Sequence, residues 1–357
     1  MADQRRSHND PRTGQHSNAF FRHRMAVFPS PTYYPATPCP RIAVNVEAML
    51  DPEIAEALKA VPPMNGFAFD QLPAMRAARN AQMATIQLSD RVERTDYQVP
   101  GPAGAPDVLI RVHRPKGATG DLPCVYFMHG GGYVFGTYAM DDLRFDHWCP
   151  MLNCVGVSVE YRLAPETPYP GPLEDAYAGL KYVYENAATL GIDRAKLGIG
   201  GASAGGGLAA GLALLTRDRA EVPLAFELLI YPMIDDKMVT ESSTWEVPIW
   251  NPRSNNDGWT AYLGGPRGGE GISMYAAASR ATDLAGLPPT YIMVGALDGF
   301  LDEDVDYAMR LTRAGVPTEL HVYPGGPHGF DGLLPGTQLA RRARKDMEDW
   351  LARQFAK

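Results

Sequence analysis

Residues 196–208 read KLGIGGASAGGGL. In this stretch a short apolar run leads into a Gly-x-Ser-x-Gly sequence centred on Ser203, and a segment rich in alanine and leucine follows. The pattern predicts a strand, a tight turn and a helix. Gly201 and Gly205 permit the turn, because side chains at these positions would collide with the neighbouring strand and helix. We therefore expect Ser203 to hold its hydroxyl at the carboxyl end of a strand, on a strained backbone.

A second glycine-rich sequence, HGGGY at residues 129–133, directly follows the apolar run VYFM at 125–128. Glycines leave the backbone bare, so successive N–H groups can approach a developing negative charge without side chains in the way. The expected donors to such an oxyanion are the N–H groups of Gly131, Gly132 and Ala204, the last at the start of the helix that follows Ser203. His129 is expected to brace the loop through hydrogen bonds rather than to carry protons.

Two later sequences supply a candidate acid and a candidate base. Asp298 lies just past the apolar run 291–294, and His328 lies in a glycine-rich loop after the run 319–323. A serine hydroxyl is a weak nucleophile until a base removes its proton, and histidine suits that task at neutral pH. Asp298 would orient the imidazole and stabilise its protonated form. Asp302 is the alternative acid; its other interpretation is a first-turn residue that complements the dipole of a helix.

The remaining sequence alternates between the two kinds of secondary structure. Apolar or alternating runs predict strands at 92–99, 108–114, 124–128, 155–159, 197–200, 226–230, 291–294 and 319–323. Helical periodicity predicts helices at 173–188, 207–217, 302–314 and 338–355. The class is therefore α/β, with an eight-strand, mostly parallel sheet flanked by helices, in which the first hairpin is antiparallel. Ligands of such sheets bind at the carboxyl ends of the strands, where all the motifs above fall.

Four segments follow from composition along the chain. Residues 1–40 are polar and then proline-rich, which predicts a disordered or extended tail; Met25 is an alternative start. Residues 41–90 carry two helical patterns, one opening at Pro52 and one over 72–86, and form a helical cap. Residues 91–357 are expected to form an α/β domain that carries the catalytic candidates Ser203, Asp298 and His328. Within it, residues 235–269 are expected to form a long insertion that lines a substrate pocket.

Four sequences together, HGGG at 129–132, YRLAPE at 161–166, GASAG at 201–205 and HGF at 328–330, resemble the hormone-sensitive-lipase-like group of esterases, called bacterial family IV. The resemblance spans from about residue 45 to the C-terminus. It implies an α/β-hydrolase fold with an N-terminal helical cap and no cofactor. It also implies a serine carboxylesterase that hydrolyses short- to medium-chain esters through an acyl-enzyme intermediate, and, as in several relatives, a homodimer through the last strand and helix.

The sequence departs from the family at two places. Ala202 stands where the family commonly has aspartate before the nucleophile, and Gly299 and Phe300 stand where the family has proline and leucine after the acid. Aromatic residues in the cap and the insertion point to a pocket suited to aryl or bulky acyl esters. The expected pocket residues are Phe67, Phe69, Tyr133, Trp245, Trp250 and Phe300. Trp259 and Tyr262 are expected in the core instead.

Other functions remain open at this stage. An amidase, a lactonase or a transacylase would use the same three residues, because specificity resides in the pocket. A receptor of the same fold that binds a ligand without catalysis is the alternative from a different class. Ser203, Asp298 and His328 are all present, and this favours catalysis.

In the sequence YRLAPE, Arg162 and Glu166 are expected to form an ion pair that fixes the loop.

Composition and charge limit the kinds of partner, cell compartment and metal that we expect for this protein. The formal net charge of −8, without a long basic cluster, gives no reason to expect nucleic acid as a partner. The sequence shows no membrane span and no export signal, so we expect a cytoplasmic protein. The four cysteines lack the spacing of a zinc site, so no metal is expected. Cys124 and Cys154 fall in apolar runs and are expected to be buried thiols.

Overall fold

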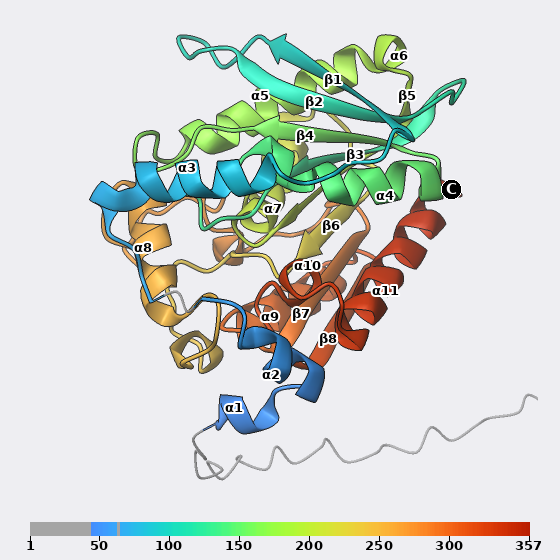
Figure 1. Cartoon of the computed structure of the whole chain (residues 1–357). Helices are drawn as coiled ribbons and strands as arrows, with labels where there is room; N and C mark the ends of the chain where they lie inside the picture. The colour runs from blue at the N-terminus through green and yellow to red at the C-terminus, as the bar shows by residue number, and fades with distance from the viewer. Residues whose placement is uncertain (1–43, 63–64) are drawn as a thin grey trace, which may run out of the picture. The chain divides into compact units, whose positions relative to one another are not determined.

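The computed structural model describes residues 44–62 and 65–357, and Figure 1 shows the arrangement of its helices and strands. The predicted tail over 1–40 lies outside the described residues. The strands are β1 (Val92–Val99), β2 (Val108–Pro115), β3 (Leu122–Met128), β4 (Val155–Glu160), β5 (Ile192–Ala202), β6 (Glu227–Ile230), β7 (Thr290–Leu297) and β8 (Thr318–Pro327). The α-helices are α1 (Val46–Met49), α2 (Pro52–Leu58), α3 (Leu72–Met83), α4 (Asp142–Leu152), α5 (Gly171–Glu185), α6 (Ala187–Leu190), α7 (Ala204–Arg219), α8 (Pro252–Leu263), α9 (Leu301–Arg313), α10 (Phe330–Leu333) and α11 (Gln338–Phe355).

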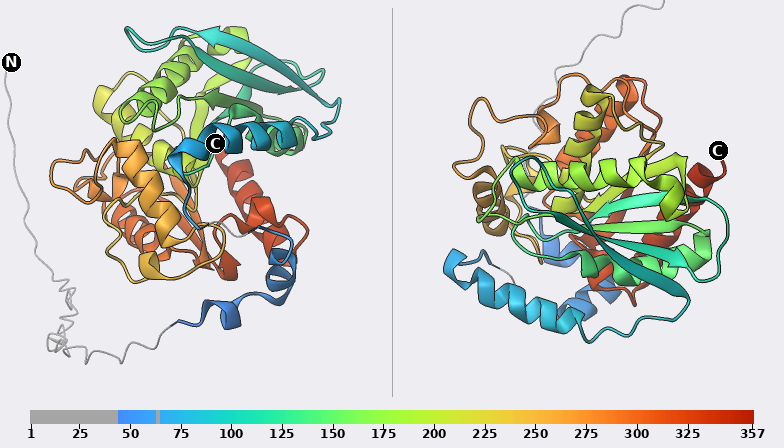
Figure 2. Two further views of the ribbon diagram at one scale, coloured as in Figure 1. Left: turned by 60° about the vertical axis from the view of Figure 1, so that its left-hand side comes forward. Right: turned by 90° about the horizontal axis from the view of Figure 1, so that it is seen from above.

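All eight strands belong to one sheet, in the order β1-β2-β4-β3-β5-β6-β7-β8. β2 runs antiparallel to both of its neighbours, and every other pair is parallel. The predicted eight-strand, mostly parallel sheet with an antiparallel first hairpin is therefore confirmed. Two further views show β1 and β2, in teal, at one edge of the sheet and β8, in red, at the other (Figure 2).

Helices cover both faces of the sheet, which is why its central strands are apolar on both sides. On one face, α5, α7 and α9 bury side chains such as Leu180, Leu212 and Leu311 in a single cluster. On the other face, α4 and α11 pack the rings of Trp148 and Trp350 against a second cluster. α2 adds to this second face.

The predicted helices and the observed ones differ at several places. The predicted helix 173–188 ends at Glu185, and α6 continues after one residue. The helix predicted over 72–86 ends at Met83. The sequence prediction missed α4, which carries Pro150 within it, and α8, which lies in the segment predicted as a pocket-lining insertion. Because β3, β5, β7 and β8 are parallel, the loops that follow them meet at one edge of the sheet, and the candidate site lies there.

Candidate active site

Ser203 lies in the turn between β5 and α7, with φ 57° and ψ −122°. A residue with a side chain rarely adopts this conformation, and contacts on both sides hold it here. The N–H of Ser203 donates to the carbonyl of Ile230 at 2.9 Å, and its carbonyl accepts the N–H of Met233 at 2.9 Å. A Cβ at Gly205 would lie 2.1 Å from the carbonyl oxygen of Met128, so the turn packs directly on the end of β3.

The structure brings the three predicted side chains Ser203, His328 and Asp298 into one hydrogen-bonded chain. The hydroxyl of Ser203 lies 2.9 Å from Nε2 of His328, and Nδ1 of His328 lies 2.8 Å from Oδ2 of Asp298. The second carboxylate oxygen of Asp298 accepts the N–H of Phe300 at 3.0 Å. All three side chains are buried. With this geometry His328 can accept the serine proton while Asp298 holds the ring in the required tautomer.

Asp302, the alternative acid, has a different partner. Its Oδ2 accepts the N–H of Ser242 at 2.9 Å, and its own N–H donates to the hydroxyl of Ser242 at 3.0 Å. This reciprocal pair ties the start of α9 to the loop at residue 242. Among the contacts of the described residues, the carboxylate that meets His328 is that of Asp298.

The glycine loop after β3 passes beside the turn of Ser203. A Cβ at Gly130 would lie 3.3 Å from Cβ of Ser203 and 2.9 Å from the carbonyl oxygen of Ala202. Gly131 and Gly132 have φ of 126° and 60°, conformations that favour glycine. In the part of the chain that the structure describes, neither of them donates its N–H to a backbone carbonyl. Among the described residues, both N–H groups therefore lack a backbone acceptor, as expected of donors that would bind an anionic oxygen.

His129 braces the glycine loop, as the sequence suggested. Its ring stacks on Tyr161 with centroids 4.2 Å apart, and Nδ1 lies 2.9 Å from the carbonyl oxygen of Gly130. The hydroxyl of Tyr161 donates to the carbonyl of His129 at 2.7 Å. Burial lowers the pKa of His129, which favours the neutral ring.

Three of the predicted pocket residues pack against the glycine loop, against His328 or against each other. The indole of Trp250 lies over Gly132, where an added Cβ would be 2.1 Å from Cη2 of the ring. Phe300 meets the ring of His328 edge-on, with centroids 5.0 Å apart. Phe67 lies 6.3 Å from Trp250 between ring centroids. These contacts place aromatic rings against a predicted oxyanion donor and the predicted base.

The other predicted pocket residues have different surroundings. The side chain of Tyr133 is wholly buried, stacks on Tyr262 at 3.8 Å and donates its hydroxyl to the carbonyl of Met233, so the prediction that it lines the pocket is corrected. Phe69 is 44% exposed and meets the ring of Phe67 edge-on, with centroids 5.7 Å apart. Trp245 is half-buried and packs with the small cluster around Val247. Trp259 and Tyr262 lie in the core, as expected.

The expected ion pair between Arg162 and Glu166 is wrong. Arg162 instead binds Asp175 of α5 through Nε and Nη2, at 2.7 and 2.6 Å. Glu166 pairs with Arg76 of α3, whose two terminal nitrogens lie 2.8 and 3.0 Å from its carboxylate oxygens. The spacing within one loop gave no sign of either partner, because Asp175 and Arg76 come from the helices α5 and α3.

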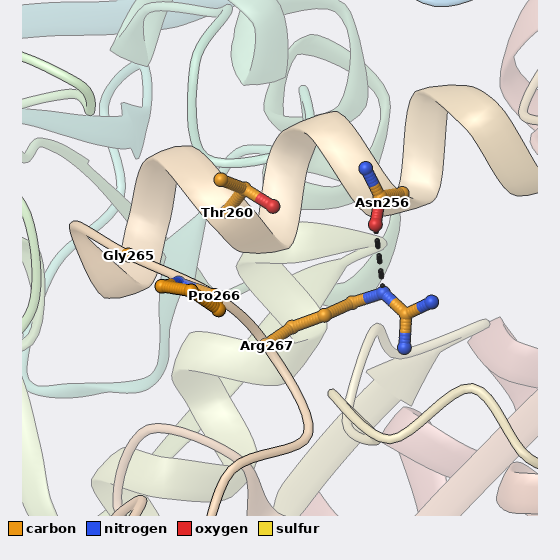
Figure 3. A pocket seen from close by; sticks show the side chains of 5 residues that line it. All are labelled: Asn256, Thr260, Gly265, Pro266 and Arg267. Carbon is orange, nitrogen blue, oxygen red and sulfur yellow. Dashed lines mark hydrogen bonds between the residues drawn. The ribbon is translucent and has the colours of Figure 1, made fainter.

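A surface hollow of about 480 Å³ lies at the end of α8 and is separate from these residues (Figure 3). Its lining residues are Asn256, Thr260, Gly265, Pro266 and Arg267. Nε of Arg267 donates to Oδ1 of Asn256 at 2.9 Å. The hollow lies within the segment 235–269 but shares no residue with the predicted substrate pocket.

Sequence reasoning missed two buried acids next to the site. Glu303 and Asp304, in the first turn of α9, are both buried. Burial raises the pKa of each carboxyl well above its usual range, and neighbouring carboxylates, Asp298 among them, raise it further. The only sign in the sequence was the run of acids at 302–304, which is the ordinary pattern of a helix N-terminus.

Comparisons with known proteins agree with this geometry. A family model described as the alpha/beta hydrolase fold matches residues 125–332, which is more than half of the chain. Carboxylesterase NlhH of Mycobacterium tuberculosis is 36% identical over 244 residues, which cover 66% of this chain and 75% of that protein. The solved structure of a bacterial heroin esterase has 39% identity and a TM-score of 0.81, and the match covers 86% of this chain and 98% of that one.

A second solved structure, esterase LipW from Mycobacterium marinum, has 35% identity and a TM-score of 0.79 over 88% of this chain and 99% of that one. None of the helices in the described part of the chain has the length and apolar character that a membrane span requires. The chain belongs to the α/β-hydrolase fold family, within the hormone-sensitive-lipase-like group that its motifs indicated.

Proposed function

We propose that this protein is a serine carboxylesterase that hydrolyses short- to medium-chain or aryl carboxylic esters through an acyl-enzyme intermediate. The observation that carries the proposal is the hydrogen-bonded chain of Ser203, His328 and Asp298 beside the glycine loop. In that loop the N–H groups of Gly131 and Gly132 have no backbone acceptor among the described residues. The names of the relatives, carboxylesterase and esterase, support the same class of reaction.

The proposed mechanism assigns one task to each group. His328 takes the proton of the Ser203 hydroxyl through Nε2 as the serine oxygen attacks the acyl carbon. The N–H groups of Gly131, Gly132 and Ala204 stabilise the oxyanion that forms on the former carbonyl oxygen. His328 then gives the proton to the leaving alcohol. Water repeats the sequence on the acyl-enzyme and releases the acid, and Asp298 supports the charged imidazole in both halves.

Replacement of the nucleophile tests the proposal. Ser203→Ala should lower kcat for p-nitrophenyl acetate by about four to six orders of magnitude, because the members of a catalytic triad act as a unit. Ser158→Ala is a matched control: this serine is also buried, and its hydroxyl has no hydrogen-bond partner among the described residues. The control should keep wild-type turnover. Ester hydrolysis that survives Ser203→Ala would refute the assignment.

We further propose that the substrate carries an aromatic or bulky acyl group. Trp250 against Gly132 and Phe300 against His328 support this, because one ring lies beside a predicted oxyanion donor and the other beside the predicted base. Aromatic rings favour aromatic ligands through offset or edge contacts. A panel of p-nitrophenyl esters, anilides and lactones separates an esterase from an amidase and from a lactonase, which would use the same three residues.

Two proposals concern the environment of the protein. We propose a cytoplasmic location; Cys124, Cys149 and Cys154 are free, buried thiols, which suits a reducing compartment.

We also propose a homodimer through β8 and α11. β8 lies at the edge of the sheet, where its outer backbone groups can pair with a second chain, and Val322 on it is 39% exposed.

A further inference from the structure

Glu303 is a buried carboxyl that the mechanism above does not use. It lies in α9, which begins three residues after Asp298. Its Oε1 accepts the backbone N–H groups of Ile234 and Asp235, at 3.3 and 3.2 Å. Its other oxygen has no hydrogen-bond partner among the described residues. Glu303 therefore links α9, which follows the proposed acid in the chain, to the segment that follows β6.

This segment contacts both other parts of the proposed machinery. Met233, the residue before Ile234, donates its N–H to the carbonyl of Ser203 at 2.9 Å. The carbonyl of Met233 accepts the hydroxyl of Tyr133 at 2.9 Å, and Tyr133 directly follows Gly132 in the glycine loop. One residue thus joins the turn of the nucleophile to the loop of the oxyanion donors, and Glu303 holds the two peptide groups next to it.

The charge state of Glu303 suits this role. Burial raises its pKa well above the usual range for a carboxyl, and Asp235 and Asp298 raise it further. Its protonated, neutral form is therefore favoured. A neutral carboxyl has the same shape and the same accepting oxygen as a glutamine side chain.

We propose that Glu303 is a positioning residue, which holds the segment 233–235 so that the hydroxyl of Ser203 and the donors of the glycine loop meet the same acyl group. This proposal rests on the proposed esterase function. It predicts an effect on the alignment of reacting groups rather than on substrate binding. A small displacement of such groups lowers the rate of the chemical step far more than it weakens binding.

The segment has a second attachment that should keep it folded without Glu303. The N–H of Ser279 donates to the carbonyl of Ile234 at 3.2 Å, and its hydroxyl donates to Oδ1 of Asp235 at 2.9 Å. Removal of Glu303 therefore leaves the segment tethered at one side. We expect the segment 233–235 to stay folded in the variant but to lose its native position around Met233.

Asp304 supplies a matched control in the same turn of α9. It is as buried as Glu303, and neither of its carboxylate oxygens has a hydrogen-bond partner among the described residues. Both Glu303→Ala and Asp304→Ala remove a buried carboxyl of similar environment. Only the first removes a contact to the segment 233–235.

The experiment compares Glu303→Ala, Glu303→Gln and Asp304→Ala with wild type, well below each melting temperature. The measurements are kcat and KM for p-nitrophenyl acetate and the rate at which a p-nitrophenyl phosphonate labels Ser203. Glu303→Ala should lower kcat and the labelling rate by about 10- to 100-fold, with KM changed by less than about threefold. Glu303→Gln should recover kcat to within about threefold of wild type, because its amide oxygen accepts the same N–H groups. Asp304→Ala should keep kcat within the same limits.

Each other outcome overturns an identifiable claim. Full kcat in Glu303→Ala, equal losses in Glu303→Gln and Glu303→Ala, or an equal loss in Asp304→Ala would refute the positioning role while wild-type turnover sustains the esterase function. A wild-type protein with neither turnover nor labelling at Ser203 would refute both.

Discussion

At the scale of single residues, Trp250 is the side chain whose position most directly bears on substrate choice. Its indole lies so close to Gly132 that a methyl group at residue 132 would overlap the ring. Nε1 of Trp250 donates to Oδ1 of Asn255 at 3.2 Å, which fixes the ring from the first turns of α8. A rigid aromatic plane beside an oxyanion donor limits and orients the group attached to the reacting carbonyl.

Trp250→Ala should therefore change preference rather than abolish activity. The ratio of kcat/KM for p-nitrophenyl benzoate to that for p-nitrophenyl butyrate should fall by about 5- to 20-fold, the scale of one lost aromatic contact. Trp245→Ala is the control, since Trp245 lies in the same segment but packs with Val247 and Leu297. An unchanged ratio in Trp250→Ala, or an equal change in both variants, would contradict the role of this ring.

At the scale of elements, the sequence predicted what depends on local pattern. The parallel strands β3 to β8 are apolar runs and β1 and β2 have an alternating pattern, so all eight strands were recognisable. The motifs marked Ser203, Asp298 and His328 before any geometry was known. α4 was not predicted because Pro150 interrupts a segment of mixed polarity. Its helical state depends on the packing of Phe145 and Trp148 against the sheet.

Partners of long charged side chains could not be predicted in the same way. Glu166 is the nearest acid after Arg162 in the sequence, yet α5 places Asp175 within 2.6 Å of that guanidinium. Such a side chain reaches across several ångströms, so its partner is decided by how whole elements pack. In the structure, Tyr133 lies in the core and not in the predicted pocket. Its backbone has a φ of 64°, and its ring stacks on Tyr262.

The most consequential of these contacts attaches α3 to the glycine loop through Arg76. Besides its pair with Glu166, Arg76 donates from Nε to the carbonyl of Val134 and from Nη2 to the carbonyl of Ala164, each at 2.7 Å. Val134 in turn donates its N–H to the carbonyl of Gly131 at 3.1 Å. The helix of the proposed cap is thus connected by two hydrogen bonds to a predicted oxyanion donor.

Arg76→Ala should lower kcat/KM for p-nitrophenyl butyrate by about 5- to 20-fold, because two carbonyl contacts and the ion pair are lost together. Glu166→Gln should cost no more than about threefold, since it removes charge from a partly exposed pair but keeps both carbonyl contacts. Steady-state kinetics at low and at 0.5 M salt would separate the two effects. Equal losses in the two variants would show that the ion pair alone holds α3 in place.

At the scale of the whole molecule, buried acids make folding stability depend on pH. Burial raises the pKa of Asp141 to about 7 and that of Glu227 to about 8. Glu227 is fully buried in β6, and among the described residues Oε2 of its carboxylate has a partner, the hydroxyl of Thr290 at 3.1 Å, while Oε1 has none. Such a group binds its proton more tightly in the folded state than in the unfolded state, so folding favours lower pH.

The direction in which Glu227 makes stability depend on pH follows from its pKa of 4.5 in the unfolded state and about 8 in the folded state. Below pH 4.5 both states hold the proton and the group carries no penalty. Between pH 4.5 and about 8 the unfolded state releases the proton while the folded state keeps it. The free energy of unfolding therefore falls as pH rises through this range, by up to about 1.4 kcal/mol per pH unit for one group. Above pH 8 the penalty is constant.

Glu227→Gln removes this titration, so the variant should not lose stability through this range as wild type does. The difference in melting temperature, variant minus wild type, should grow between pH 5 and pH 8 by several degrees, the shift that up to about 4 kcal/mol produces in a protein of this size. Glu246→Gln, an exposed glutamate, is the control and should track wild type at every pH. Thermal unfolding in buffers of constant ionic strength measures the difference. A difference that stays flat across this range would mean that Glu227 is already ionised in the folded protein at pH 5, and that burial in β6 does not hold its proton.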